Sequence, residues 1–241
     1  METNPEYLLL KLGITIPLIG VYDTPELSFF SEILKPKSEG KGACMFAYYK
    51  KWLEGKHLLL TKDCFGCRGC GNWFWNVQRR SREEFVEFLV DEEGLKVDAE
   101  TMNAWLDENY PYIADHDNMV VGPLEEKASA YLKTVSFFVN PDQLSALITG
   151  AHYFQKPGDQ PLVMTPFGSG CMELLPMFDD FEKPMAIIGS TDIAMRQHLP
   201  ANIMIFTVTV PMFELLCSLD DKSFLNKPFI SRLINSRGGS L

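Results

Sequence analysis

The sequence predicts a single compact α+β or α/β domain in which helices flank a mixed β-sheet. Two observations carry this prediction. The chain has 241 residues, 46% of them hydrophobic and 22% charged, and no low-complexity spacer divides it. Its second half alternates short β-rich runs with helix-opening signals. A chain of this length and composition buries a core of its own, so we expect one domain over residues 1–241.

The first half contains two strand-like runs with helices around them. The runs are TIPLIGVYD at 15–23 and HLLLT at 57–61, and the segment between them has apolar residues at helical spacing. Ser81 and Glu84 form an S-x-x-E capping box, which predicts a helix start before FVEFL. A further helix is expected over 99–109, where the apolar residues share one face.

From about residue 134 onward the pattern becomes rich in β-branched and aromatic residues. Four strand-like runs follow one another: TVSFFV, PLVMTP, PMAIIG and NIMIFTVTV. Asn140 followed by Pro141 predicts a helix cap with proline in the first turn, and Pro211 opens a helix in the same way. The strands and helices of this half therefore alternate, and no internal repeat is visible.

Charge and hydrophobicity limit the possible partners. The formal net charge of -10 opposes binding to a phosphate backbone. The basic cluster RRSR at 79–82 runs into an acidic segment, so we interpret it as a solvated helix start or, alternatively, as a weak contact for an anion. The amino-terminal segment lacks the features of a secretory signal, and no long apolar run occurs. We expect a cytoplasmic protein whose partner is neither nucleic acid nor a membrane.

The stretch DCFGCRGCGNWFW at 63–75 is the strongest chemical signal. Cys64, Cys67 and Cys70 form C-x2-C-x2-C, and the glycines between them allow a tight loop whose amides approach the sulfurs. The spacing matches the first three ligands of a bacterial ferredoxin run, whose fourth cysteine would fall where this chain has Phe74. A fourth ligand must come from elsewhere. The aromatic residues that end the stretch are expected in the core, with shielding of the loop from water as the alternative.

Two remote cysteines are candidates for the fourth ligand. Cys44 lies at the first turn of an expected helix, and Cys171 lies in a glycine-rich turn at a helix start, where amides favour a thiolate. The alternative for each is a small buried hydrophobe, which is our interpretation of Cys217. Asp192 and Arg196 stand four residues apart, either as a surface ion pair or as part of a cofactor-binding site at a strand end.

Several longer motifs resemble a known family. They are LGITIPLIGVY, the run from GACMFAYYK to CFGCRGC, TVSFFVNPDQLSALITGAHYF, PFGSGCMELL and GSTDIAMRQHLPANIMIFTVTVP. As a set they resemble domain-of-unknown-function family 169, a family of uncharacterised prokaryotic proteins. The resemblance implies that Cys44, Cys64 and Cys171 belong to a shared site. In the commoner form of the family fewer cysteines occupy the loop, so the resemblance assigns no family-wide role to Cys67 and Cys70, and it implies no reaction.

Three functional hypotheses follow. The first is an iron–sulfur protein with one 4Fe–4S cluster on the three loop cysteines and Cys44 or Cys171, used in electron transfer or redox-linked small-molecule chemistry. The second is a structural zinc site on four of the same cysteines, in a binding or interaction module. The third is a dithiol of Cys64 and Cys67 that cycles with a disulfide, modulated by Cys70. The sequence carries no nucleotide-binding, nucleophile-elbow or zincin motif. The expected partner is a small molecule or an electron-transfer protein, and the sequence does not identify which one.

Overall fold

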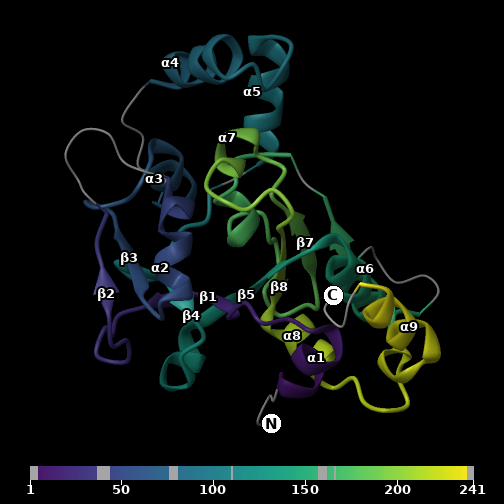
Figure 1. Cartoon of the computed structure of the whole chain (residues 1–241). Coiled ribbons are helices and arrows are strands. Elements are labelled where there is room, and N and C mark those ends of the chain that lie inside the picture. Colours follow the sequence, from purple (N-terminus) through teal and green to yellow (C-terminus); the bar gives the residue numbers. More distant parts are fainter. Residues whose placement is uncertain are drawn as a thin grey trace.

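An eight-stranded mixed sheet forms the centre of the computed structural model, with the strand order β2-β3-β4-β1-β5-β8-β7-β6 (Figure 1). The structure describes residues 5–36, 44–75, 81–109, 111–156, 162–165 and 167–237. The strands are β1 (Ile19–Thr24), β2 (Ile33–Leu34), β3 (His57–Thr61), β4 (Asn118–Pro123), β5 (Leu132–Val139), β6 (Val163–Met164), β7 (Ala186–Gly189) and β8 (Met204–Thr209). Each edge strand pairs in parallel with its neighbour, and the inner pairs are antiparallel. The predicted α+β class with a mixed sheet is confirmed.

Helices cover both faces of this sheet. The α-helices are α1 (Glu6–Leu12), α2 (Tyr49–Leu53), α3 (Arg68–Trp75), α4 (Arg82–Glu87), α5 (Ala99–Glu108), α6 (Pro141–His152), α7 (Ile193–Arg196), α8 (Val210–Cys217) and α9 (Pro228–Ser236). The short 3-10 helices are η1 (Met45–Tyr48), η3 (Glu126–Tyr131), η4 (Met172–Leu174) and η5 (Phe224–Asn226), and η2 (Phe88–Glu92) is a π-helix. None of the described helices is long and apolar enough to cross a membrane.

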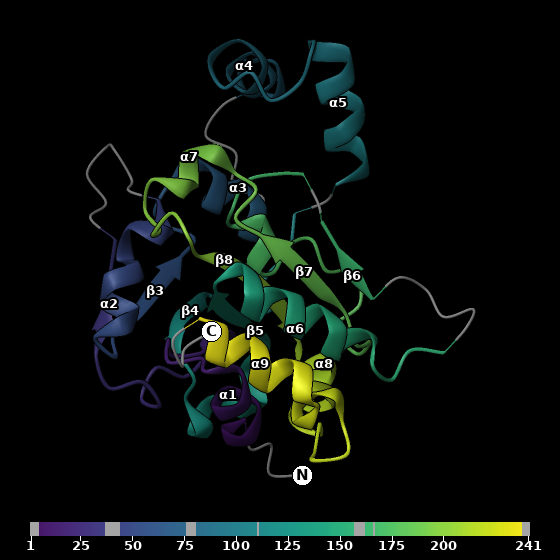
Figure 2. The same cartoon turned by 45° about the vertical axis from the view of Figure 1, so that its right-hand side comes forward.

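Side chains alternate between the two faces, and the two largest hydrophobic cores lie on opposite faces. In β5, Val135, Phe137 and Val139 pack into one core, whereas Phe138 packs into the other. The first of these cores lies under α1, α6, α8 and α9, which gather on one side of the sheet in Figure 2. The second core contains residues of α2, α3, η4 and α7. The cysteine cluster described below lies on this second face.

Local signals in the sequence locate several helix starts correctly. The Ser81 hydroxyl accepts the Glu84 amide over 3.2 Å and the Glu84 carboxylate accepts the Ser81 amide over 3.0 Å, so the predicted capping box is confirmed. Asn140 forms a second capping box at α6, and Pro141 is the first residue of that helix. Proline also lies in the first turn of α8, as predicted from Pro211. These caps are readable because their partners are three residues apart.

Other expectations change once tertiary contacts are seen. The strand expected at 15–23 begins at Ile19, and the run PLVMTP contributes only the two residues of β6. Arg82 is not simply solvated: its guanidinium donates to Asn103 Oδ1 over 2.8 Å and to Asp107 Oδ1 over 2.7 Å, which ties α4 to α5. The rest of the basic cluster, apart from Ser81, lies outside the described residues.

The helices α4, η2 and α5 form a lobe that projects beyond the sheet, next to α3 and α7 (Figures 1 and 2). Aromatic contacts join this lobe to the body. The ring of Trp105 in α5 meets Trp73 of α3 edge-on at 5.8 Å between centroids and meets Phe167 at 5.3 Å. Lys96 lies over the Phe167 ring at 4.1 Å. The lobe therefore packs against α3 and the segment just before Cys171, which are two of the three segments that supply the cysteines described below.

Candidate functional site: a buried cysteine cluster

Four of the six cysteines meet on the α3 face, although they come from three distant parts of the chain. Cys67 immediately precedes α3, Cys70 lies in its first turn, and Cys44 and Cys171 are the N-cap residues of η1 and η4. The Cys67 thiol donates to Cys70 Sγ over 3.8 Å, and the Cys70 thiol donates in turn to Cys171. Cys44 lies close enough to Cys67 that a negative charge on the Cys67 sulfur raises the pKa of Cys44. We call these four residues the cysteine cluster.

Two sulfurs and an aromatic ring surround the Cβ position of Gly69 at ordinary van der Waals distances. A Cβ atom at this residue would lie 3.6 Å from Cys67 Sγ, 3.8 Å from Cys171 Sγ and 3.7 Å from Cδ1 of Trp73. Two sulfurs and an indole ring therefore border the same small space. Trp73 and the two aromatic residues after it are buried in the core that contains Cys70, so the core interpretation is confirmed, and Trp73 borders the sulfurs as well.

The cluster holds its thiols protonated. The bond donated to Cys70 and burial raise the pKa of Cys67 well above its usual range, and the bond donated to Cys171 and burial do the same to the pKa of Cys70. Burial raises the pKa of Cys44 to about 12. The bond accepted from Cys70 lowers the pKa of Cys171, but burial and neighbouring negative charges outweigh it, so this pKa is also raised. Neutral thiols of this kind are poor nucleophiles.

Asp192 adjoins the cluster, whereas Arg196 does not enter it. Asp192 accepts an amide of α7 as the N-cap of that helix, and its other oxygen accepts the Gly170 amide over 2.8 Å, directly before Cys171. Arg196 donates to backbone carbonyls at 200–203 and closes the loop after α7. Within the described part of the chain the two side chains form no ion pair with each other. Their part in binding a cofactor stays a prediction.

The sequence patterns did not single out Glu173, which is fully buried two residues after Cys171. Its carboxylate accepts the Ser190 amide over 2.7 Å, and it accepts both the amide and the hydroxyl of Thr191. Burial raises the pKa of Glu173 to about 7 despite these bonds. Ser190 has a positive φ of 69°, which costs energy in a residue with a side chain, and the turn thereby presents its amides to Glu173. The available signal was an acidic residue inside the apolar run CMELL.

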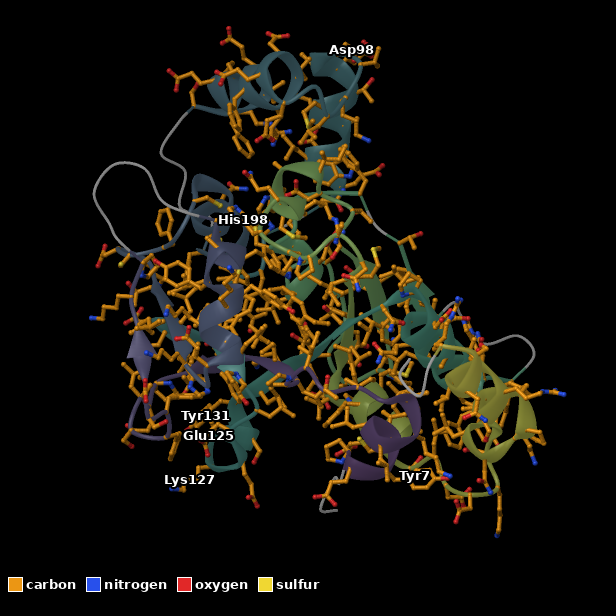
Figure 3. The ribbon with its side chains drawn as sticks, in the orientation of Figure 1. Tyr7, Asp98, Glu125, Lys127, Tyr131 and His198 are labelled. Carbon is orange, nitrogen blue, oxygen red and sulfur yellow. The ribbon has the colours of Figure 1, made fainter. Side chains whose placement is uncertain are left out.

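A second buried carboxylate, Asp23 in β1, was also not predicted. It accepts the Tyr112 hydroxyl over 2.7 Å, the Asp115 amide over 2.8 Å and the His116 amide over 3.0 Å, and His116 Nδ1 lies 3.0 Å away. We call these four residues the Asp23 cluster. The His116 ring meets Tyr131 edge-on at 5.9 Å, and Figure 3 shows Tyr131 with Glu125 and Lys127 around η3. In the same view His198, which follows α7, lies well away from them.

Cys64 lies outside the cysteine cluster. Its thiol donates to the Pro36 carbonyl over 3.4 Å, and its amide donates to the Thr61 hydroxyl over 3.1 Å. Among the described residues it forms no hydrogen bond with another sulfur. Its role as a metal ligand stays a prediction that these contacts do not support. Cys217 packs against the core under α8 and burial raises its pKa to about 12, which confirms its interpretation as a small hydrophobe.

The present arrangement is one of thiols rather than of metal ligands. In the part of the chain that the structure describes, no three His, Cys, Asp or Glu side chains are placed so that they could hold a metal ion as they stand. The sulfurs form a hydrogen-bonded row instead. The iron–sulfur, zinc and dithiol hypotheses therefore all stay predictions.

An α+β domain with four clustered cysteines on one face of its sheet, two of them buried and two partly buried, is the class of protein that this fold and site define. The model of family DUF169, described as "Uncharacterised ArCR, COG2043", matches residues 18–218. The chain therefore belongs to this family, as its motifs predicted. The matched range contains both the cysteine cluster and the Asp23 cluster. No curated protein and no solved structure matches the chain.

Proposed function

We propose that this chain is a metal-binding protein whose centre is held by Cys44, Cys67, Cys70 and Cys171. The observation that carries the proposal is the 3.8 Å separation of the sulfurs of Cys67, which is partly buried, and Cys70, which is buried beside Cys171. Sulfurs bound at about 2.3 Å to one tetrahedral ion are about 3.8 Å apart. The pair already has the spacing that a single shared ion requires.

The chemistry of the donor set supports a soft metal. Thiolates select zinc, monovalent copper and iron–sulfur clusters over magnesium or calcium. The raised pKa values belong to the metal-free chain, in which neutral thiols lie side by side without charge repulsion. A bound metal deprotonates its thiol ligands, so loading replaces the hydrogen bonds of the row by metal–sulfur bonds and releases protons. Binding should therefore strengthen as the pH rises.

A zinc ion is the occupant that the sulfur spacing favours most. A four-cysteine site leaves no open position for substrate, and such sites stabilise a fold rather than catalyse a reaction. Here the ion would join the starts of η1, α3 and η4, which no continuous secondary structure connects. The proposed role is thus a structural centre in a binding or interaction module.

An iron–sulfur cluster is the second candidate. The C-x2-C-x2-C spacing and the burial of the sulfurs among aromatic residues favour it. Each cysteine of a 4Fe–4S cluster binds a different iron atom, so the sulfurs would have to move apart. Such a centre would serve electron transfer or redox-linked chemistry on a small molecule. The dithiol of Cys64 and Cys67 is less favoured, because the raised pKa of Cys67 suppresses the thiolate that disulfide exchange needs and the Cys64 thiol donates to the Pro36 carbonyl.

Anaerobic purification followed by elemental analysis and visible spectroscopy tests the proposal. We expect a colourless protein with one zinc ion per chain, and loss of that zinc in the Cys44→Ser, Cys70→Ser and Cys171→Ser variants. The matched control is Cys217→Ser, which changes a cysteine in the other core and should keep its metal. A brown protein with iron and sulfide would favour the second candidate. A folded protein without any metal, before and after incubation with zinc or with iron and sulfide, would contradict the proposal.

A further inference from the structure

We infer that Cys67 and Cys70 form a reversible disulfide under oxidising conditions, which makes the start of α3 a modification site for a small-molecule disulfide. The pair differs from the dithiol of Cys64 and Cys67 that the sequence spacing indicated. The inference concerns the metal-free chain and does not rest on the proposed metal centre. Three observations support it: the distance between the two sulfurs, the unequal access to them, and the separate contacts of Cys64.

The two sulfurs already lie close together. The Cys67 thiol donates to Cys70 Sγ over 3.8 Å, and a disulfide bond needs a separation of about 2.05 Å. Cys67 immediately precedes α3 and Cys70 lies in the first turn of that helix, so both side chains come from one short segment. Residues three apart at a helix start are neighbours, and rotation of the two side chains closes the remaining gap.

Access to the thiols is unequal. Cys67 is partly buried, whereas Cys70 is 0% and Cys171 is 5% exposed. A small disulfide in solvent therefore meets Cys67 first. The bond donated to Cys70 and burial raise the pKa of Cys67, against the effect of the Gly69 and Cys70 amides, so the first attack is slow. A slow attack delays the reaction but leaves its equilibrium unchanged.

The reaction balances with the small-molecule disulfide as the oxidant. The thiolate of Cys67 attacks one sulfur of that molecule, which breaks its S–S bond, forms a mixed disulfide on Cys67 and releases one small thiolate. The Cys70 sulfur, once deprotonated, attacks the Cys67 sulfur, which forms the bond between the two cysteines and releases the second small thiolate. The two protons of the protein thiols pass through solvent to the two small thiols. Two protein thiols are oxidised and one small disulfide is reduced.

The other cysteines are less well placed for this reaction. The Cys64 thiol donates to the Pro36 carbonyl over 3.4 Å and forms no hydrogen bond with a sulfur among the described residues. Cys217 lies in the other core. Cys171 adjoins Cys70 but is buried and comes from a distant turn. Cys64 and Cys217 are therefore matched controls, and Cys171 is the competitor that an experiment has to separate.

Equilibration of the full, metal-free chain in buffers of reduced and oxidised glutathione, followed by acid quenching and alkylation of the remaining thiols, tests the inference. We expect the oxidised samples to lose two alkylation sites and excess reduced glutathione to restore both. Trypsin cleaves after Arg68, so mass spectrometry should find peptides 63–68 and 69–79 joined by a disulfide. Fragmentation of the joined peptides should place the alkyl group on Cys64.

Variants identify the two partners. Cys67→Ser and Cys70→Ser should abolish the link between the two peptides, whereas Cys64→Ser and Cys217→Ser should form it to the same extent as wild type. The inference is overturned if wild type keeps all six thiols in the most oxidising buffer, if Cys67 stops at a glutathione adduct, or if Cys70 is linked to Cys171 instead. Should a serine variant not fold, the peptide map of wild type still decides the question.

The outcomes are distinct from those that test the proposed function. Metal content is measured on a separate, reduced sample of the same chain. A chain that forms the disulfide but binds no metal would contradict the proposed function and support the inference. A chain that binds metal but forms no disulfide after the metal is removed would overturn the inference and leave the metal centre in place.

Discussion

The Asp23 cluster and the cysteine cluster differ in whether their hydrogen bonds are complete. In the Asp23 cluster, a fully buried carboxylate receives two amides and a tyrosine hydroxyl and is 3.0 Å from an imidazole nitrogen. In the cysteine cluster, thiols bond only weakly to one another, and the adjoining Trp73 indole has no acceptor among the described residues. A cluster whose hydrogen bonds are complete is stabilised by the chain alone, whereas the weakly bonded cysteine cluster has sulfurs that could still bind a ligand.

The largest expected effect is the loss of metal-dependent stability in Cys70→Ser. If zinc binds the folded chain alone, then zinc at 1,000 times its dissociation constant stabilises wild type by about 4 kcal/mol. The variant lacks the cysteine whose sulfur bonds to two others of the cluster, so most of this increment should vanish. Denaturant unfolding with and without zinc measures it, and Cys217→Ser is the control that should keep the increment. If zinc stabilised wild type and Cys70→Ser equally, the cysteine cluster would not be the zinc site, and it would not differ from the Asp23 cluster in needing a ligand.

The second effect concerns the complete cluster. Asp23→Asn keeps the size of the side chain but replaces an acceptor oxygen by a donor, so buried amide or hydroxyl donors lose their partner. We expect a loss of about 3 kcal/mol in the free energy of unfolding, with no change in metal content. Urea unfolding and elemental analysis of the same sample measure both. A variant that keeps its stability but loses its metal would show that the clusters act as one site.

The third effect is a pH dependence from Glu173, which is hydrogen-bonded like Asp23 but adjoins the cysteine cluster. Its pKa is about 7 in the folded chain against an ordinary value of 4.5, so the folded state holds this proton more tightly. The stability it contributes is complete below about pH 4.5 and is lost as the pH rises to about 7, by up to about 1.4 kcal/mol per pH unit. Unfolding of metal-free wild type and Glu173→Gln between pH 5 and 8 measures it. If the difference between the two does not fall with rising pH, Glu173 does not titrate in this range.

The smallest effect is expected from Cys64→Ser. This thiol bonds to the Pro36 carbonyl and to no sulfur in the described part of the chain, and a serine hydroxyl can donate to the same carbonyl. Stability should change by less than about 1 kcal/mol, and the metal content should match wild type. Elemental analysis of Cys64→Ser and of Cys67→Ser under the same conditions compares their metal content. Loss of metal from Cys64→Ser would restore the loop cysteine that the sequence pattern assigned to the site.

By itself the sequence determined the class of fold, several helix starts and the segments that carry the cysteines. Capping boxes at Ser81 and Asn140 depend on partners three residues away, so local chemistry is sufficient to predict them. The spacing C-x2-C-x2-C made its three cysteines equivalent. Tertiary structure separated them: Cys67 and Cys70 meet at the start of α3, whereas Cys64 belongs to the turn after β3.

Only the tertiary structure decided which distant residues complete the site. Cys171 reaches the loop because Asp192 and Glu173 fasten its turn to the segment after β7, and that segment is held by pairing of β7 with β8. Such contacts join residues far apart in the chain, and no local pattern encodes their distance. The hydrogen-bond partners of Asp23 and Glu173 could not be predicted for the same reason. A buried carboxylate is stable only because of donors supplied by other segments, and those donors come together only when the chain is folded.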